Sequence, residues 1–385
     1  RRQVSLAALR PAMARQLHAL EPYAPPPSLV GRLTRPPPKE RFALGVLPTP
    51  LHAWHLPAAS SLGINLWIKR DDLSGCLLSG NKVRKLEFHL AAALAARSDA
   101  VLTIGGAQSN HARATAVATA VAASVPGSSV KGCHLILRTA ESEVGRDPGV
   151  AGNLLPSRLA GATLHMVSKQ RYAAEGGDAL LASLADSLAA AGGRPHIIPL
   201  GGSDALGAWG YVEAAFELVA QTAGAPFDDI VLATGSGGTL AGLAAGLRLA
   251  GWADTRITAL CVCDTPDYFY DKVDADLEAL GVPEGWWPGA REALEVVQAR
   301  GAGYGIARPA ELDTLMAAAA ATGIVLDPCY TGKALHGFLV AAAAAPARWA
   351  GRRVLFLHTG GYLGAAGSPE LAARVVAAGG ASALE

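Results

Sequence analysis

The most informative segment of this chain reads Ser79-Gly80-Asn81-Lys82-Val83-Arg84-Lys85-Leu86-Glu87-Phe88. The glycine permits a tight turn, and the asparagine is expected to start a helix. Lys82 and Lys85 then lie three residues apart in the first turn and share one face of the helix. Because a helix start already carries partial positive charge, two ammonium groups there are unfavourable. The pattern predicts a bound anion or a lysine that is not a free ammonium, unless both lysines are solvated surface groups. A Schiff-base lysine beside a phosphate would satisfy both conditions.

Composition excludes several classes of protein. The chain has 385 residues, 33 of them basic and 32 acidic, and a net charge of +1, which gives no basis for a nucleic-acid surface. No run reaches the roughly 18 apolar residues of a membrane span. An odd number of irregularly spaced cysteines argues against a disulfide framework and for a reducing compartment. Cys261 and Cys263 alternate as on one face of a strand, and no metal site is expected.

The first forty residues form a region of distinct composition. They are rich in arginine and contain one acid, Glu21, before Glu40, and they carry two clusters of three prolines. Arginine-rich, acid-poor sequence is typical of an organelle transit segment. The arm, residues 1–40, is therefore expected to be a transit remnant or, equally, a disordered or docked arm. The first alternative places the protein in an organelle, the mitochondrion before the chloroplast, and the second in the cytoplasm.

From about residue 64 the chain alternates apolar strands, glycine turns and helices. Continuous apolar strands between helices predict parallel sheets that are covered on both faces. Ligands of such folds bind at the carboxyl ends of the strands. The expected strands span residues 66–69, 99–104, 133–137, 163–167, 196–199, 229–233, 257–262, 324–326 and 354–357.

The turn Thr234-Gly235-Ser236-Gly237-Gly238-Thr239 follows one of these strands and opens a helix. Its backbone N–H groups and hydroxyls would suit a phosphate. A dinucleotide fingerprint would need a third glycine where Leu240 stands, and no P-loop lysine follows. The turn therefore indicates a phosphate without identifying the cofactor, and the alternative is a helix start with flexible glycines.

A second turn, residues 105–111, has the same layout. Ser109 is a candidate N-cap, and the helix start behind it would suit a substrate carboxylate. His111 could act as a base, although a histidine at a helix start is more often structural. Tyr304 and Tyr330 lie beside glycine or proline turns. A phenol there is either a surface group or a group that binds or protonates a leaving group.

These motifs occur in the order seen in one enzyme family. The segments 80–87, 104–111, 201–203, 235–239 and 327–330 resemble those of D-cysteine desulfhydrases and 1-aminocyclopropane-1-carboxylate (ACC) deaminases, which are pyridoxal 5'-phosphate (PLP) enzymes of the tryptophan-synthase-β fold type. The resemblance runs from about residue 40 to the C-terminus. It implies an α/β fold of type II, with two open twisted, mainly parallel sheets covered by helices. It also implies a large PLP domain (41–83 and 198–385), a small domain (84–197) and a homodimer.

The resemblance also implies roles for individual residues. It makes Lys82 the Schiff-base lysine, Lys85 a phosphate neighbour and Asn110 the partner of the PLP ring hydroxyl. It places Ser109 beside the substrate carboxylate and the Cα proton. The implied cofactor-binding set is Lys82, Lys85, Asn110, Thr234, Gly235, Ser236, Gly237, Gly238, Thr239 and Thr359. The implied catalytic residues are Lys82, Ser109, Tyr304 and Tyr330, and those for substrate binding are Ser109, Asn110, His111, Tyr330 and Thr331.

Three positions separate the two branches of the family. ACC deaminases typically have Glu where Thr331 stands, Leu where Thr359 stands and Gln where His111 stands, so the chain resembles the desulfhydrases. A carboxylate near the pyridine nitrogen would keep it protonated and strengthen the electron sink, which opening a cyclopropane needs more than loss of a thiolate does. Thr359 is the preferred partner of the ring nitrogen, and Thr331 is the second choice.

The expected reaction converts D-cysteine and water to hydrogen sulfide, ammonia and pyruvate, with Lys82 or Ser109 as the base at Cα. D-serine, β-chloro-D-alanine and L-cysteine are further candidate substrates. The alternatives are ACC deaminase and a PLP-binding protein without turnover. A third alternative is a nicotinamide-dependent oxidoreductase, although the missing third glycine of the fingerprint argues against it.

Overall fold

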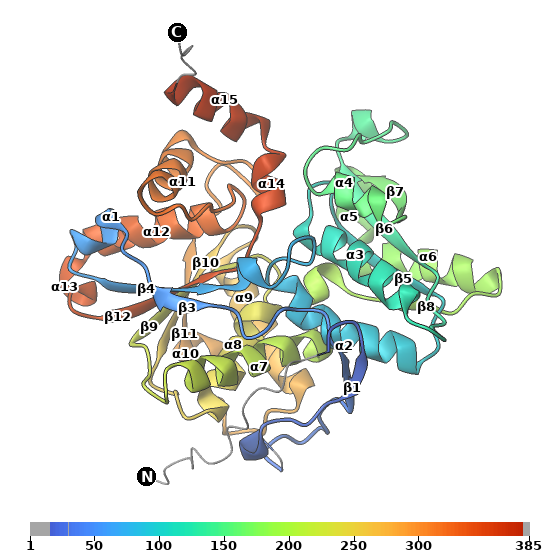
Figure 1. The fold of residues 1–385 in the computed structure, drawn as a ribbon, viewed down its shortest axis with the longest axis horizontal. Helices are drawn as coiled ribbons and strands as arrows, with labels where there is room; N and C mark the ends of the chain where they lie inside the picture. The colour runs from blue at the N-terminus through green and yellow to red at the C-terminus, as the bar shows by residue number, and fades with distance from the viewer. Residues whose placement is uncertain (1–15, 30, 380–385) are drawn as a thin grey trace.

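A computed structural model describes residues 16–29 and 31–379 of the chain. Two sheets lie side by side, and each is sandwiched between helices (Figure 1). The larger has six strands in the order β11-β10-β9-β12-β4-β3, and the smaller has four in the order β7-β6-β5-β8. All neighbouring strands in both sheets are parallel except β3 and β4. The fold is therefore the expected α/β arrangement with two mainly parallel sheets.

The larger sheet is buried on both faces because its strands are apolar throughout. In β9, Ile230 and Leu232 pack against α7, α8 and α9, whereas Val231 and Ala233 pack against α11 and α12 on the other face. Its strands are β3 (Leu51–Ala53), β4 (Asn65–Arg70), β9 (Asp229–Thr234), β10 (Arg256–Cys261), β11 (Leu294–Gln298) and β12 (Arg353–His358). Its helices include α1 (Pro57–Ser60), α7 (Ala205–Gln221), α8 (Gly238–Leu249), α9 (Pro266–Leu280), α10 (Ala290–Ala293), α11 (Pro309–Thr322), α12 (Thr331–Ala344) and α13 (Pro346–Trp349).

The smaller sheet follows the same rule. In β6, Leu135 and Leu137 pack with Leu154 of α4. Ile136, on the opposite face of the same strand, packs with Leu180 and Leu181 of α6. Its strands are β5 (Ala100–Gly106), β6 (Gly132–Thr139), β7 (Thr163–Ser168) and β8 (Pro195–Ile197). Its helices are α3 (Asn110–Ser124), α4 (Leu154–Leu159), α5 (Lys169–Glu175) and α6 (Gly177–Ala190).

Helix α2 (Lys82–Ala95) connects the two halves, since it contacts α7 and β2 as well as α3. The expected domain boundary after residue 83 falls inside this helix and stays a prediction. Two short helices, α14 (Tyr362–Ala366) and α15 (Pro369–Ala378), end the described chain (Figure 1).

The described part of the arm is docked rather than free. Its strand β1 (Leu20–Pro22) pairs antiparallel with β2 (Glu40–Phe42). Tyr23 is buried, and its hydroxyl donates to Glu213 Oε1 at 2.5 Å. Residues 1–15 and 30 lie outside the described residues, and with them four of the six arginines on which the prediction of a transit segment rests.

The strand assignments need correction in both directions: one expected strand is absent, and the short strands β1, β2 and β3 and the edge strand β11 were not expected. Residues 324–326 form no strand: Ile324 and Leu326 are buried but Val325 is exposed, and the run is a connection without regular structure that leads into the turn at Asp327. Conversely, β11 was not expected, because this edge strand carries Glu295 and Gln298 and lacks a continuous apolar run. Apolar length alone does not report whether a partner strand is present.

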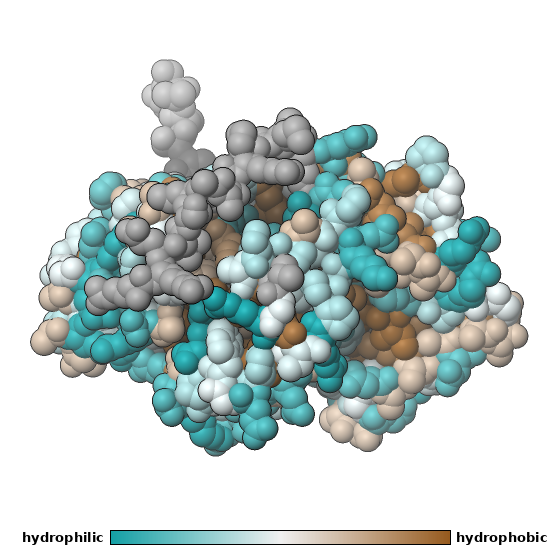
Figure 2. All heavy atoms as spheres, turned by 90° about the horizontal axis from the view of Figure 1, so that it is seen from below, coloured by the Kyte–Doolittle hydropathy of each residue, from teal (hydrophilic) through white to brown (hydrophobic). Residues whose placement is uncertain are grey.

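On the face seen in Figure 2, hydrophilic residues dominate, and hydrophobic ones gather toward the side of the smaller sheet. Among the described residues, no helix combines the length and the apolar character that crossing a bilayer requires.

Candidate active site

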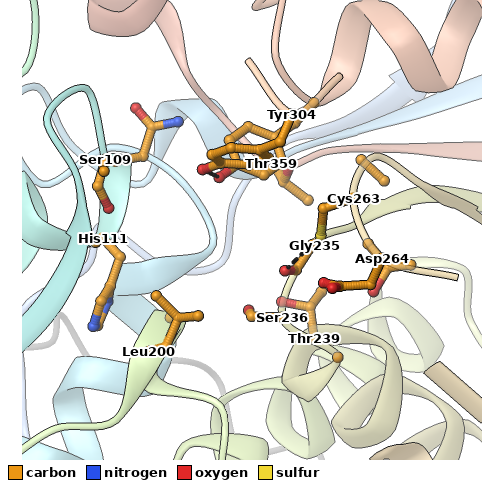
Figure 3. A pocket seen from close by; sticks show the side chains of 18 of the residues that line it. Ser109, His111, Leu200, Gly235, Ser236, Thr239, Cys263, Asp264, Tyr304 and Thr359 are labelled. Atoms are coloured by element: carbon orange, nitrogen blue, oxygen red, sulfur yellow. Dashed lines mark hydrogen bonds between the residues drawn. The ribbon is translucent and has the colours of Figure 1, made fainter. Parts of the chain in front are cut away.

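A cavity of about 600 Å³ lies where the carboxyl ends of both sheets meet. This volume suits a small cofactor together with an amino acid. Figure 3 shows Ser109 and His111 on one side of it, and Gly235, Ser236 and Thr239 on the other. The predicted site residues that line it are Lys82, Ser109, Asn110, His111, Thr234, Gly235, Ser236, Gly237, Thr239, Tyr304, Tyr330 and Thr359.

Lys82 is the first residue of α2 and reaches into this cavity. Its Nζ donates to the carbonyl of Gly201 at 3.2 Å. Burial lowers the pKa of Lys82 from 10.5 to about 8, because the charged amine has lost its water. A substantial fraction of the amine is therefore neutral near physiological pH and is able to act as a nucleophile.

Lys85, one turn further along, is fully buried and does not line the cavity. Its Nζ donates to Ser203 Oγ at 2.9 Å and to the Gly201 carbonyl at 3.3 Å. Ser203 Oγ in turn lies 2.8 Å from Ser236 Oγ. Burial, followed by the charge of Lys82, lowers the pKa of Lys85 well below its ordinary value. The hydroxyls of Ser203 and Ser236 thus lie between Lys85 and the cavity, so Lys85 is not placed to contact a ligand there directly.

The glycine turn after β9 opens α8. The N-cap, Gly237, has a φ of 82° and provides no side-chain cap. The first N–H groups of α8 have no acceptor within the helix, as in every helix start. The turn is held from both sides: Asn81 Nδ2 donates to Thr239 Oγ1 at 3.0 Å, and a Cβ on Gly235 would lie 2.9 Å from the Tyr330 ring. Gly238 is the first residue of α8 and does not line the cavity.

The opposite wall is the start of α3. Ser109 is its N-cap as predicted, and its Oγ accepts from the Ala112 N–H at 3.1 Å. His111 is buried, and its Nε2 lies 2.8 Å from Thr103 Oγ1. Since the Thr103 hydroxyl donates its proton to the carbonyl of Ile198, the imidazole donates to Thr103. Burial lowers the pKa of His111 well below its ordinary value, so the ring is neutral.

Tyr304 and Tyr330 come together although 26 residues separate them. Their hydroxyl oxygens lie 2.5 Å apart, and the rings meet edge to face. Loss of water around the paired hydroxyls raises the pKa of both phenols above the ordinary value, although Tyr304 as a whole is 40% exposed. Both therefore stay protonated and can donate hydrogen bonds to a developing anion.

The two threonines proposed for the ring nitrogen occupy different places. Thr359 follows β12 and lines the cavity, where Figure 3 shows it beside Tyr304. Thr331 is fully buried and does not line it; its hydroxyl donates to Asp327 Oδ1 at 2.7 Å. The expectation that Thr331 contacts substrate does not fit this position, because the turn at Asp327 already uses its hydroxyl.

Sequence reasoning missed several lining residues. Asn81 starts α2 at the N-cap position as expected, but its side chain makes no cap hydrogen bond and donates to Thr239 Oγ1 instead. Cys263 and Asp264 lie beyond the end of β10, so Cys263 is not a strand residue, and both face the cavity (Figure 3). The rule that ligands bind at the carboxyl ends of strands would have found them.

The residues present fit PLP. A partly neutral amine, an uncapped helix start with the hydroxyls of Ser236 and Thr239, and a hydroxyl after the last strand all face one cavity. A Cβ on Gly201 would lie 2.4 Å from Ser236 Oγ and 3.2 Å from Lys82 Nζ, so only glycine leaves room for the Ser236 and Lys82 side chains here. An aldehyde-bearing phosphate ester matches this donor set.

Comparisons with known proteins agree with this geometry. The family model described as "Pyridoxal-phosphate dependent enzyme" matches residues 42–360. The chain is 46% identical over 350 residues to the bifunctional D-cysteine desulfhydrase/1-aminocyclopropane-1-carboxylate deaminase, mitochondrial, of Arabidopsis thaliana, covering 89% of this chain and 83% of that protein. It is 36% identical to a putative ACC deaminase of Thermotoga maritima, covering 84% of this chain and 97% of that protein.

Solved structures give the same result. An ACC deaminase homologue superposes with a TM-score of 0.72 at 30% identity, covering 91% of this chain and 97% of that one. Maize serine racemase shares the fold alone, with a TM-score of 0.59 at 14% identity over 86% of this chain and 91% of its own. The expected family, fold and cofactor are thereby confirmed: the chain belongs to the pyridoxal-phosphate dependent enzymes.

Proposed function

We propose that this enzyme is a D-cysteine desulfhydrase, a carbon–sulfur lyase that converts D-cysteine and water to hydrogen sulfide, ammonia and pyruvate. The name of the Arabidopsis relative supports this activity, as do the positions that separate the two branches of the family. The homologous region includes every residue to which we assign a role.

The observation that carries the proposal is the hydroxyl of Thr359 at the end of β12. Among the described residues that line the cavity, the one carboxylate is Asp264, which Figure 3 shows near Thr239 and away from Thr359. A hydroxyl accepts or donates a hydrogen bond without forcing a proton onto the pyridine nitrogen. Such a site suits the loss of a thiolate, which is a good leaving group, better than the opening of a carbon ring.

Bound PLP supplies the electron sink for the electron pair that is left at Cα. Lys82 would hold the cofactor through its amine and would release it to the substrate amine, and its lowered pKa favours this because the neutral amine is the nucleophile. The turn from Thr234 to Thr239 would hold the phosphate with backbone N–H groups and hydroxyls, as an uncapped helix start does.

The remaining roles belong to the wall opposite the phosphate. Lys82 or Ser109 takes the proton from Cα, and the start of α3 binds the substrate carboxylate beside Asn110 and the neutral His111. The protonated pair Tyr304 and Tyr330 donates a hydrogen bond to the departing sulfur. General acid–base groups of this kind contribute roughly 10²- to 10⁴-fold to a rate.

A second candidate activity is ACC deamination. The Arabidopsis relative is named for both reactions, and the Thermotoga relative is named for this one. The two activities share the cofactor and the lysine that holds it, so they differ in the partner of the ring nitrogen and in what the substrate side of the cavity accepts.

One assay separates the proposals. The purified holoenzyme is incubated in turn with D-cysteine, L-cysteine, D-serine and ACC, and sulfide, pyruvate and 2-oxobutyrate are measured. We expect sulfide and pyruvate in equal amounts from D-cysteine, and loss of this turnover in Lys82→Ala. Faster formation of 2-oxobutyrate from ACC would favour the deaminase. A yellow protein without turnover on any substrate would indicate a PLP-binding protein.

We also propose a mitochondrial location and a homodimer. The location is supported by the name of the Arabidopsis relative and by the arginine-rich arm, and imaging of the full-length tagged protein tests it. The dimer follows from the resemblance to the family. Light scattering of the purified protein gives the mass, and a monomer at micromolar concentration would contradict it.

A further inference from the structure

Arg113 on α3 is a buried cation whose partners are neutral. Its side chain is 1% exposed. Within the described residues its Nε donates to Asn153 Oδ1 at 3.2 Å, its Nη2 to the Ser79 carbonyl at 3.2 Å, and its Nη1 to the Leu77 carbonyl. A guanidinium buried without a carboxylate partner is costly. This cost must be offset by what the three hydrogen bonds of Arg113 hold in place.

Two of these contacts hold the segment that leads into Lys82. Leu77 and Ser79 precede the turn at Gly80, whose φ is 98° and whose Cβ, if present, would lie 2.7 Å from the Thr359 carbonyl. The guanidinium thus joins α3 to the loop that carries the cofactor amine. This loop belongs with the larger sheet, and α3 belongs with the smaller one.

The third contact leads to the cavity. Asn153, just before α4, is 1% exposed. Its Nδ2 donates to the Gln108 carbonyl at 3.0 Å and to Asn110 Oδ1 at 2.9 Å. Its backbone N–H donates to Gln108 Oε1 at 3.0 Å. Asn110 in turn lines the cavity as the first residue of α3.

The donors and acceptors at the two ends of this hydrogen-bond network fix the orientation of both amides, those of Asn153 and Asn110. A guanidinium only donates, so the Asn153 atom that faces Arg113 is the oxygen. A backbone carbonyl only accepts, so the Asn153 atom that faces Gln108 is the nitrogen. This NH₂ group donates to Asn110 as well, and the Asn110 atom facing it is therefore the oxygen. The NH₂ group of Asn110 remains for the cavity.

We propose that Arg113 and Asn153 are positioning residues that hold the Asn110 amide with its NH₂ group toward the cavity, where it donates to the phenolic oxygen of the PLP ring. The proposal rests on the cofactor site of the proposed function, but it does not depend on the substrate. Asn110 could otherwise present either end of its amide. The orientation is decided by a cation that does not line the cavity itself.

Asn153→Asp tests this proposal with almost no change in shape. The new carboxylate still accepts from Arg113 and gains a charge partner, so the fold is retained. It has no N–H to donate, and its second oxygen would face Asn110 Oδ1. The Asn110 amide is then expected to turn and present its oxygen to the cavity. We expect a shifted visible absorption band of the bound cofactor and about tenfold weaker PLP binding in dialysis. The apoprotein should still fold, with a modestly lower Tm because the Gln108 carbonyl loses its donor.

Ser157→Ala is the matched control. Ser157 is equally buried, and its hydroxyl donates to the Asn153 carbonyl at 2.8 Å without touching the amides. It should leave the absorption band in place. In an Asn110→Ala background, the further change Asn153→Asp should no longer move the band, because its effect passes through the missing amide.

An unmoved band and unchanged PLP affinity in Asn153→Asp would overturn the proposal, as would a shift that persists in the Asn110→Ala background. If Asn153→Asp does not fold, Arg113→Lys is read instead, since its single ammonium cannot hold all three oxygens; an unmoved band there is equally negative. All these spectra are taken without substrate. Failure of D-cysteine turnover in an unaltered yellow enzyme would therefore contradict the proposed function and leave this inference standing.

Discussion

Two helix starts face each other across the cavity, and they are built differently. Helix α8 begins after Gly237, which provides no side-chain cap, whereas α3 begins after Ser109, whose hydroxyl accepts from the Ala112 N–H. The uncapped start keeps its N–H groups for a ligand and suits a phosphate dianion. The capped start offers side chains instead. In the proposed function, backbone therefore recognises the cofactor on one wall, and side chains recognise the cofactor and the substrate on the other.

The largest effect should come from placing a charge in the uncapped start. In Ser236→Asp, the carboxylate would occupy the N–H groups of α8 and repel the phosphate. Like charges placed together cost several kcal/mol, which corresponds to roughly a thousandfold weaker PLP binding. Equilibrium dialysis of the apoprotein measures this. Ser236→Ala, which only removes a hydroxyl, is the control, and an equal loss in both variants would show that charge is not the cause.

A smaller effect is expected from backbone strain in the same turn. Gly237→Ala forces a side chain into a φ of 82° and brings its Cβ to 2.8 Å from Lys272 Cγ. Such strain costs roughly 1–2 kcal/mol, and PLP affinity should fall about tenfold. Gly251→Ala, past the end of α8, strains a φ of 92° away from the cavity, meets nothing within 4 Å and should bind PLP normally. Equal affinities of the two variants would remove the distinction between backbone and side-chain recognition.

Removing the cap of α3 should have a moderate effect on stability and a separate effect on activity. Ser109→Ala loses the acceptor for the Ala112 N–H, which costs about 1 kcal/mol in the free energy of unfolding. Ser368 caps α15 in the same way, through the Leu371 N–H. Ser368→Ala should therefore lose similar stability in urea unfolding and keep its sulfide release. If both variants kept full activity, Ser109 would be only a cap.

The last expected effect is on stability and not on binding, and it concerns Lys82, which lies between the two helix starts. The folded apoprotein binds its proton with a pKa of about 8, whereas the unfolded chain keeps the proton up to about 10.5. Because the unfolded state then binds more protons between these values, the Lys82 contribution to stability rises with pH across this window. Lys82→Met removes the titrating group. The apoprotein Tm of the variant minus that of the unaltered protein should be positive at pH 7 and decrease toward pH 10; a constant difference would contradict the lowered pKa.

Local pattern predicted much of this structure. Ser109 was recognised as a cap, and the turn before Thr239 as a helix start, because turn residues and apolar strands act within a few residues. The edge strand β11 and the unpaired run 324–326 were misjudged, since strand pairing depends on a partner elsewhere in the chain. Asn153 was not recognised at all. Its role depends on contacts with Gln108, Asn110 and Arg113, some 40 residues away, and nothing near it in sequence marks them.

The sequence by itself determined the alternation of strands and helices, the glycine turns at 105–111 and 234–239, and the pair of lysines at a helix start. The tertiary structure decided which lysine faces the cavity, that Thr359 and not Thr331 lines it, and which end of the Asn110 amide is presented there. The physical reason is that propensity and periodicity are properties of neighbouring residues. Burial, pKa and the direction of a hydrogen bond depend on groups that only folding brings together.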